Sequence, residues 1–178
     1  MKHIIWLFML SLAWSGCNGT KKVALNTWHG KPETQELGNG MIKEVSIDVY
    51  RDTVFVTQVD GANKIYPVLK TGKDTALIRL QVAYDLKEPM PDSRQNYVLY
   101  IPIDNPVKLS KRKALKIDPG KVLFGLQAFH PQAGYRFLKG GDISILRKDD
   151  HTLELRVNIL DDSIASKLNG TYLIPVKE

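Results

Sequence analysis

The chain has 178 residues, of which 43% are hydrophobic and 25% are charged. This composition excludes a disordered chain, and the length predicts one domain of about 150 residues once an N-terminal leader is set aside. The net charge is +6, and without residues 1–16 it is +5, from 24 basic and 19 acidic residues. This surplus falls short of the concentrated positive charge of a dedicated nucleic-acid-binding protein.

The N-terminus has the parts of a secretory signal peptide. Lys2 gives it a positive start, residues 4–13 form an apolar stretch interrupted only by Ser11, and two small residues follow at 15 and 16. Ten residues rise about 15 Å as a helix, half the thickness of a bilayer core, so a transmembrane anchor is not predicted. We therefore expect residues 1–16 to be a signal peptide.

Cys17 is the only cysteine and directly follows Ser15 and Gly16. A single thiol is unusual in an exported protein, because oxidising compartments favour even numbers of cysteines. This ending resembles the signal of bacterial lipoproteins, with Trp14 where that family usually has leucine. The resemblance implies that Cys17 carries a diacylglycerol and anchors the chain in the cell envelope. Asn18 follows instead of aspartate, which by the same analogy implies the outer membrane, facing the periplasm.

Two alternatives to the lipoprotein stay open. One is a plain signal peptide with an incidental cysteine. The other is a eukaryotic secreted protein, because the Asn-Gly-Thr triplets at Asn18 and Asn169 fit the pattern for N-glycosylation. In the favoured case residues 17–40 are the lipidated cysteine and a tether, and residues 41–178 form a single β-rich domain.

After the tether, short segments predict strands: most alternate between apolar and polar residues, as half-buried strands do, and residues 96–103 are apolar on both faces, as in a central strand. In chain order they cover residues 45–50, 53–59, 64–69, 76–84, 96–103, 121–129, 134–138, 142–146, 153–159 and 171–176. Arg51–Asp52 is short enough for a hairpin turn, and Pro67 predicts an edge strand or a bulge. The sequence Asp118–Pro119–Gly120 predicts a type II turn. Residues 161–170 predict one short helix, with Asp162 as its cap and Gly170 at its end.

Successive strands without intervening helices predict a mainly β protein, an antiparallel meander of about nine or ten strands. So many strands either close into a barrel or divide into two stacked sheets. Trp28, before the first long strand, resembles the opening of the lipocalin family, although Asn26 stands where that family has glycine. The resemblance implies a calycin-like barrel, which we expect over a β-sandwich, with Trp28 closing one end of the core.

No motif predicts a catalytic residue, a cofactor or a metal site. His151 with Asp149 and Asp150 is the best metal candidate, but a zinc site needs three or four converging ligands and the spacing predicts no such convergence. Both acidic pairs, 149–150 and 161–162, are more simply explained by a hairpin loop and a helix cap. Cys17 is acylated or on a tether and is not expected to be a catalytic thiol.

The main charge feature is the basic stretch at residues 108–121, in which Asp118 is the only acid. Its candidate contacts with an anionic surface are Lys108, Lys111, Arg112, Lys113 and Lys116. Phospholipid headgroups, lipopolysaccharide phosphates or an acidic glycan would suit these residues. The alternative is a solvated loop whose charges discourage aggregation at a sheet edge. Nucleic acid is disfavoured by location and by the lack of aromatic residues in the stretch.

We expect a lipid-anchored envelope protein whose non-enzymatic β-domain binds an apolar small ligand or an envelope component. The apolar-ligand version requires an internal cavity of at least about 300 Å³. A hydrolase or metal-dependent enzyme is one alternative, and it requires His130 and His151 to meet in one cleft. A structural accessory subunit of an outer-membrane complex is another, and it requires an exposed apolar patch larger than a few hundred Å².

Overall fold

The computed structural model describes residues 25–38, 40–88, 92–104, 106, 109 and 113–176. Within them the chain forms eleven strands: β1 (Trp28–His29), β2 (Glu33–Glu36), β3 (Met41–Val59), β4 (Ile65–Leu86), β5 (Gln95–Asp104), β6 (Leu115–Ile117), β7 (Leu123–Gln127), β8 (Gly134–Phe137), β9 (Asp142–Arg147), β10 (Thr152–Asn158) and β11 (Gly170–Pro175). The 3₁₀ turns η2 (Pro119–Lys121) and η3 (Ala165–Leu168) connect some of them. In this part of the chain no helix has the length and apolarity needed to cross a membrane.

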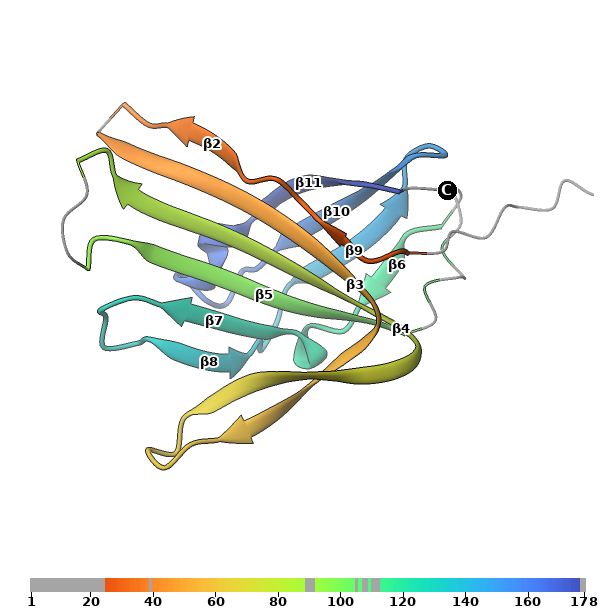
Figure 1. Cartoon of the computed structure of the whole chain (residues 1–178), viewed down its shortest axis with the longest axis horizontal. Helices are drawn as coiled ribbons and strands as arrows, with labels where there is room; N and C mark the ends of the chain where they lie inside the picture. The colour runs from red at the N-terminus through yellow and green to blue at the C-terminus, as the bar shows by residue number, and fades with distance from the viewer. Residues whose placement is uncertain are drawn as a thin grey trace, which may run out of the picture.

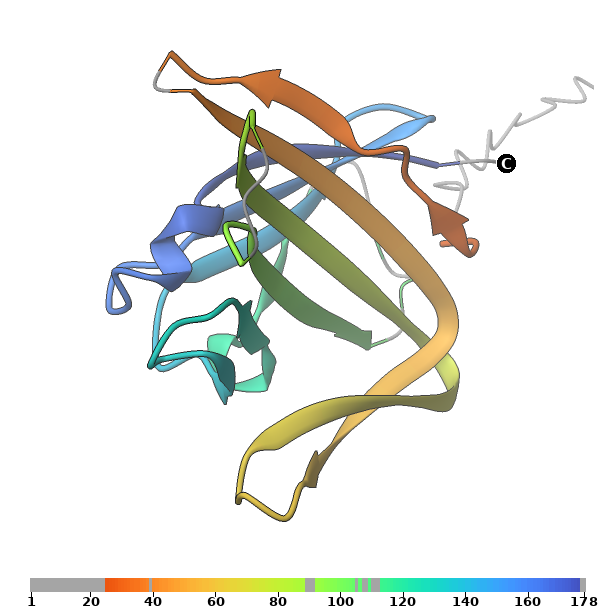
Figure 2. The ribbon, with the colours of Figure 1, turned by 60° about the vertical axis from the view of Figure 1, so that its left-hand side comes forward.

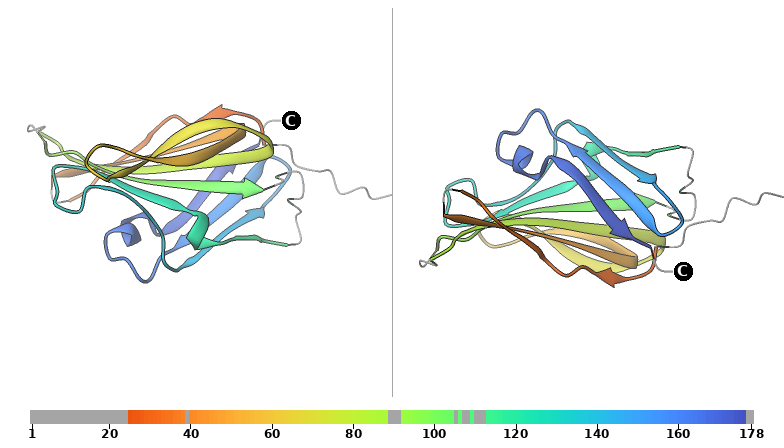
Figure 3. Two further views of the ribbon diagram at one scale, coloured as in Figure 1. Left: turned by 90° about the horizontal axis from the view of Figure 1, so that it is seen from below. Right: turned by 90° about the horizontal axis from the view of Figure 1, so that it is seen from above.

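The strands form two antiparallel sheets that face each other across one core (Figures 1 and 3). The larger sheet has the order β1-β3-β4-β5-β7-β8, with β2 also paired to β3, and the smaller has the order β11-β10-β9-β6. The predicted class, mainly β and antiparallel, is confirmed. The described strands pair as two facing sheets, and the closed calycin-like barrel stays a prediction.

The core between the sheets is built from the inward-facing residue of each alternating pair. In β10, Leu153, Leu155 and Val157 are buried while the residues between them are more exposed, as the alternation predicts. The aliphatic side chains that are 0% exposed include Ile78, Leu80, Leu99, Ile101, Ile145 and Leu155, from four strands of the two sheets. Burying each such side chain contributes about 1.5–3 kcal/mol, so this core is the main source of stability.

Most of the described part of the expected tether, residues 25–38, belongs to the fold, and its strands β1 and β2 pair with β3 in the large sheet. Leu25 is 3% exposed in the core, and Trp28 packs against the same core, as expected for this residue. The Gly30 N–H donates to the Ile47 carbonyl at 2.9 Å, and a Cβ at Gly30 would lie 2.5 Å from that oxygen. The alternation of apolar and polar residues did not predict these two strands, because β1 has only two residues and every residue of β2 is exposed.

Strand β3 continues through Arg51–Asp52 without reversing direction, so the predicted hairpin turn there is wrong. Arg51 pairs with Ala76 but Thr53 pairs with Thr71, which places Asp52 in an irregularity of the ladder with a φ of 48°. Such irregularities bend a strand pair instead of reversing it. The reversal comes at the tip, between β3 and β4. Residues 53–71, here called the ribbon, therefore extend as two strands and fold back beside the large sheet (Figure 2).

Aromatic contacts hold the ribbon over the outer face of the large sheet. The Phe55 ring lies 6.1 Å from the Tyr100 ring and 6.4 Å from the Phe137 ring, measured between centroids. Beneath it is a second apolar cluster, here called the outer cluster, with the buried residues Leu77, Val98, Tyr100 and Leu123. Pro67 pairs only with β3, at the free edge of the ribbon, so the predicted edge position is confirmed.

The predicted type II turn at 118–120 is wrong, because these residues enter η2. The Asp118 side chain accepts the Gly120 N–H at 2.9 Å, and Gly120 does not have the positive φ that a type II turn requires at its third residue. The same side chain thus caps a 3₁₀ turn.

The predicted helix at 161–170 is a single 3₁₀ turn, η3, and is shorter than expected. The N-cap residue of η3 is Ile164 and not Asp162, but the Asp162 Oδ1 supports the entry into the turn, because it accepts the N–H groups of Ile164 at 3.0 Å and Ala165 at 2.9 Å. The turn ends at Asn169, whose side-chain amide bonds both the N–H and the C=O of Ile159. Gly170 already belongs to β11, so its predicted role as the end of the helix is wrong.

We expect the Asp162 carboxylate to stabilise the fold by an amount that decreases at acid pH. Burial raises its pKa, but hydrogen bonds from the Ala165 N–H and the Arg136 guanidinium outweigh burial and hold the pKa below the ordinary 3.8. A carboxyl with a lowered folded-state pKa stabilises the fold above its unfolded-state pKa and loses that contribution as pH falls through the folded-state value. We expect Asp162→Asn to cost about 1 kcal/mol at pH 7 in urea unfolding, and the cost to vanish well below pH 3.8.

The exposed neighbour provides the matched control for this substitution. Asp161→Asn removes the same charge at an exposed side chain that does not accept the hydrogen bonds made to Asp162, and we expect no change in the free energy of unfolding. A cost of Asp162→Asn that persists undiminished at the lowest pH would contradict a role for the carboxylate charge.

Candidate functional site

The predicted contact with an anionic surface is only partly within the described residues. Cys17, Lys108, Lys111 and Arg112 lie outside them. Lys113 and Lys116 are described and exposed, Lys116 on the three-residue edge strand β6. A lysine on a short edge strand also fits the alternative of protection against edge pairing. The contact with an anionic surface therefore stays a prediction.

The histidines named for an enzyme do not come together. The β7–β8 connection, which contains His130, and the β9–β10 connection, which contains His151, lie at opposite ends of the two sheets (Figure 1). Asp149 accepts the His151 N–H at 2.8 Å, and Asp150 pairs with Arg147 at 3.1 Å, so both acids serve the hairpin loop. No group of three or more potential ligands within metal-binding reach occurs in the described part of the chain.

A polar cluster on the outer face of the large sheet was not predicted. The Asp48 carboxylate is 5% exposed and accepts Arg79 Nε at 3.0 Å and Nη2 at 2.6 Å through Oδ2, while Oδ1 lies 3.1 Å from His29 Nδ1. The His29 ring also meets the Tyr50 ring edge-on at 5.4 Å. Both carboxylate oxygens are engaged, so the cluster fastens β1 to β3 and β4. Alternation placed Asp48 on the solvent side, and only the side chains above it bury it.

A groove of about 510 Å³ opens between the tip of the ribbon and the β7–β8 hairpin. We call it the ribbon groove, and it is shallow and widely open to solvent. The ribbon tip contributes Asn63, Lys64 and Ile65, and the hairpin contributes Gln132, Ala133, Gly134, Tyr135 and Arg136. The two lining segments are about 70 positions apart in the sequence, so only the folded-back ribbon brings them together.

Tyr135 forms a fixed wall of the ribbon groove. Its ring lies across Gly125 so closely that a Cβ there would be 2.3 Å from Tyr135 Cε1. Its hydroxyl accepts a hydrogen bond from Gln127 Nε2 at 2.6 Å. The ring also lies 6.3 Å from that of Tyr100, whose pKa is raised to about 12, first by burial and then by Tyr135. The aromatic wall is therefore preorganised by the outer cluster.

The ribbon groove has a positive and hydrogen-bonding lining. None of its eight lining residues is acidic. Lys64 is exposed and takes part in none of the ion pairs formed within the described residues. The Arg136 guanidinium pairs with the Asp162 carboxylate at 2.7 Å, and its Cζ lies 4.5 Å from the centroid of the Phe124 ring. The charge of Arg136 is therefore directed toward the core side. Lys64 and the amides of Asn63 and Gln132 are thus the groups able to meet a ligand.

Two smaller hollows lie where the sheets meet. One, of about 280 Å³, is lined by Trp28 and Lys31 at one edge and by Tyr172 and Leu173 of β11 at the other. The second, of about 150 Å³, lies between the end of β8 and the loop at Asp161. Both open to the surface, and both are smaller than the ribbon groove.

Comparison of the chain with known protein families, with curated proteins and with solved structures finds no match. The class of protein is therefore defined by its architecture, two facing antiparallel sheets with a folded-back ribbon. Its function has to be argued from the N-terminal sequence and from the ribbon groove.

Proposed function

We propose that this chain is a lipid-anchored protein of the cell envelope whose non-enzymatic β-domain binds an anionic envelope component in the ribbon groove. Cys17 is the anchor in this proposal, and the outer membrane, on its periplasmic side, is the location. The observation that carries the binding site is the groove of about 510 Å³ with Lys64 at its rim, Tyr135 as its wall and no acid in its lining.

An anionic component fits this groove better than an apolar small ligand does. Side chains that are 0% exposed, such as Leu99 and Leu155, pack the middle of the core, and the hollow of about 280 Å³ between the sheet edges at Trp28 and Tyr172 falls just below the roughly 300 Å³ required for an apolar ligand. The ribbon groove is larger and is rimmed by amides and an ammonium group. A phosphate or carboxylate can accept hydrogen bonds from Lys64, Asn63 and Gln132, and a sugar ring can stack on Tyr135. Lipopolysaccharide phosphates and acidic glycans combine these features.

Binding to the groove is tested with a phosphorylated, lipid-free oligosaccharide of the lipopolysaccharide type. In calorimetric titrations at low salt we expect Lys64→Gln to weaken binding about fivefold, the effect of losing about 1 kcal/mol from one exposed ion pair. The affinity of the parent should fall as salt is added, because exposed charges are screened.

Lys31→Gln is the matched control, since it removes the same charge from an exposed lysine outside the ribbon groove. We expect it to leave the affinity unchanged, and an uncharged glucan should not bind the parent. Equal losses from both lysine variants would mean that only the overall charge matters and would contradict the groove as the site.

The anchor is tested by mass spectrometry of the mature N-terminus from a bacterial host. We expect Cys17 to be the first residue and to carry a diacylglycerol, and Cys17→Ser to remain uncleaved or to leave the membrane fraction. An unmodified Cys17, or cleavage at another position, would contradict the anchor and the proposed location.

A further inference from the structure

We infer that the end of the domain at which the chain enters at Leu25 lies against the anionic phospholipid headgroups of the membrane that holds Cys17, and that the ribbon groove opens away from that membrane. The inference rests on the proposed anchor. Beyond the anchor, it specifies which surface of the domain contacts the bilayer and from which side a ligand reaches the ribbon groove.

Packing determines where the chain enters the domain. Leu25 is 3% exposed, the Gly30 N–H is bonded to the Ile47 carbonyl at 2.9 Å, and His29 is bonded to Asp48 at 3.1 Å. These contacts hold the first described residues on β3. They lie at the end where β5 finishes, on the right in Figure 1. The chain toward Cys17 therefore leaves from this end.

The length of chain before Leu25 limits how the domain can be turned. Eight steps separate Cys17 from Leu25, a reach of at most about 29 Å. The ten residues of β5 run about 30 Å from one end of the large sheet to the other. To bring the far end to the bilayer, the tether would have to extend fully along the domain, which costs conformational entropy at every residue. With the entry end toward the bilayer no such extension is needed.

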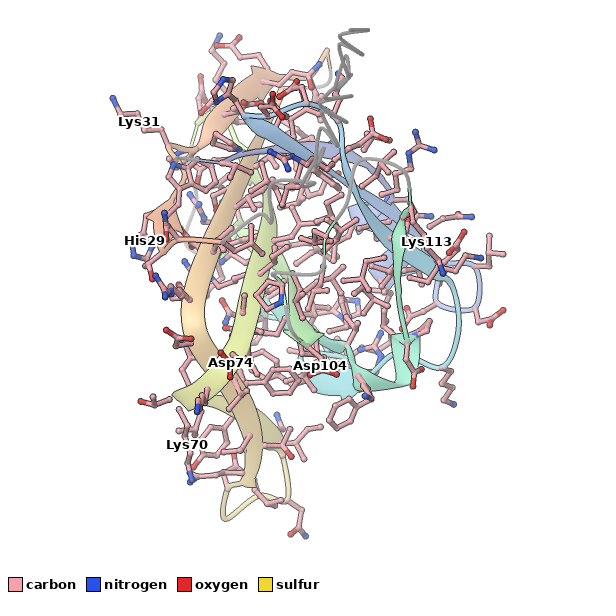
Figure 4. The ribbon with its side chains drawn as sticks, turned by 90° about the vertical axis from the view of Figure 1, so that its right-hand side faces the viewer. His29, Lys31, Lys70, Asp74, Asp104 and Lys113 are labelled. Atoms are coloured by element: carbon pink, nitrogen blue, oxygen red, sulfur yellow. The ribbon has the colours of Figure 1, made fainter. Side chains whose placement is uncertain are left out.

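The entry end carries lysines suited to phospholipid headgroups. Figure 4 looks onto this end and shows Lys31, Lys70 and Lys113 spread around its outline. All three are exposed, and none of them takes part in an ion pair within the described residues. An anionic membrane attracts such lysines when they come within a Debye length of it, about 8–10 Å.

The acids of this end weaken the attraction only in part. Asp104 pairs with Lys121 at 3.5 Å, which leaves Asp74 as the acid labelled in Figure 4 that has no ion-pair partner among the described residues. Of the residues labelled in Figure 4, three lysines and one acid take part in no ion pair within the described residues, and Lys148 and Asp149 of the β9–β10 connection add one charge of each sign, so these residues together are positive.

The ribbon groove lies at the other end of the domain. The ribbon tip and the β7–β8 connection, which line it, are both on the left in Figures 1 and 3, away from the chain entry. A ligand therefore reaches the groove from the compartment and not from the bilayer that holds the anchor.

The test uses the lipidated full chain in vesicles of phosphatidylglycerol and phosphatidylethanolamine that carry a nickel-chelating headgroup. A nitroxide is attached at Lys113→Cys or, as the matched control, at Lys64→Cys, both exposed lysines. We expect the nickel at the headgroups to relax the label at position 113 several-fold more strongly than the label at 64. The contrast should shrink in vesicles of phosphatidylcholine, which lack anionic lipid.

Failures of the anchor and of the orientation are distinguishable in this experiment. A chain that does not float with the vesicles contradicts the anchor and with it the orientation. A chain that floats while both labels relax equally, or the label at 64 more, overturns the orientation alone. An unchanged contrast in phosphatidylcholine overturns the contribution of the lysines to it.

Discussion

Replacing Phe124 with alanine is expected to lower the free energy of unfolding by about 3–5 kcal/mol. Phe124 is 0% exposed on β7, and the Arg136 guanidinium covers its ring at 4.5 Å. The substitution leaves a cavity in the core and removes the aromatic face from under that charge. Urea unfolding followed by circular dichroism measures the loss. Since small domains are stable by only about 5–15 kcal/mol, the variant would lose a large share of its stability.

Phe129 provides the matched control, because it is the same residue type but is 91% exposed in the β7–β8 connection. Phe129→Ala is expected to change the free energy of unfolding by less than about 0.5 kcal/mol. Similar losses from both substitutions would contradict the position of the core between the sheets.

Gly125→Ala is expected to damage the ribbon groove and to destabilise the fold by about 1–3 kcal/mol. The new Cβ would lie 2.3 Å from Tyr135 Cε1, so the ring has to leave its place across β7. Loss of that wall should weaken binding of the oligosaccharide more than Lys64→Gln does. Calorimetric titration and urea unfolding of the same preparation separate the two effects.

The pKa of Tyr100 is also expected to change in Gly125→Ala. Burial is the main reason that this pKa is raised from 10.0 to about 12, and Tyr135 is the next cause. Displacing Tyr135 admits water to the Tyr100 hydroxyl, which lowers its pKa toward the ordinary value. Ultraviolet titration of the phenols measures this shift, with Tyr100→Phe identifying the signal.

Gly38→Ala is the control for Gly125→Ala, because an added Cβ at Gly38 meets no atom within 4 Å. It should leave the stability, the affinity and the Tyr100 titration unchanged. If Gly125→Ala binds the oligosaccharide as the parent does, Tyr135 is not part of the binding site.

Local patterns predicted much of the fold and little of the candidate site. Alternation located the strands around residues 76–84 and 153–159, and an apolar run on both faces located the one around 96–103, because these patterns depend only on consecutive residues. The reversal at Arg51–Asp52 was misplaced, because two polar residues fit a hairpin turn and a bulge equally well. Which of the two forms depends on the partner strand, here β4.

The ribbon groove could not be predicted for a similar reason. Asn63 and Lys64 look like an ordinary turn, and Gln132 and Tyr135 like another, until the ribbon folds back over Tyr100. The basic stretch was easy to find because its charges lie close together in the sequence, yet three of its five candidate contacts, Lys108, Lys111 and Arg112, lie outside the described residues.

By itself, the sequence determined the mainly β class and the antiparallel order of neighbouring strands, because both follow from local periodicity and short connections. It is also the only basis for the anchor at Cys17, which remains a proposal. The tertiary structure decided the division into two sheets, the burial of Asp48 and the position of the ribbon. These depend on contacts between residues far apart in the chain, such as Phe55 with Tyr100, and no local pattern encodes them.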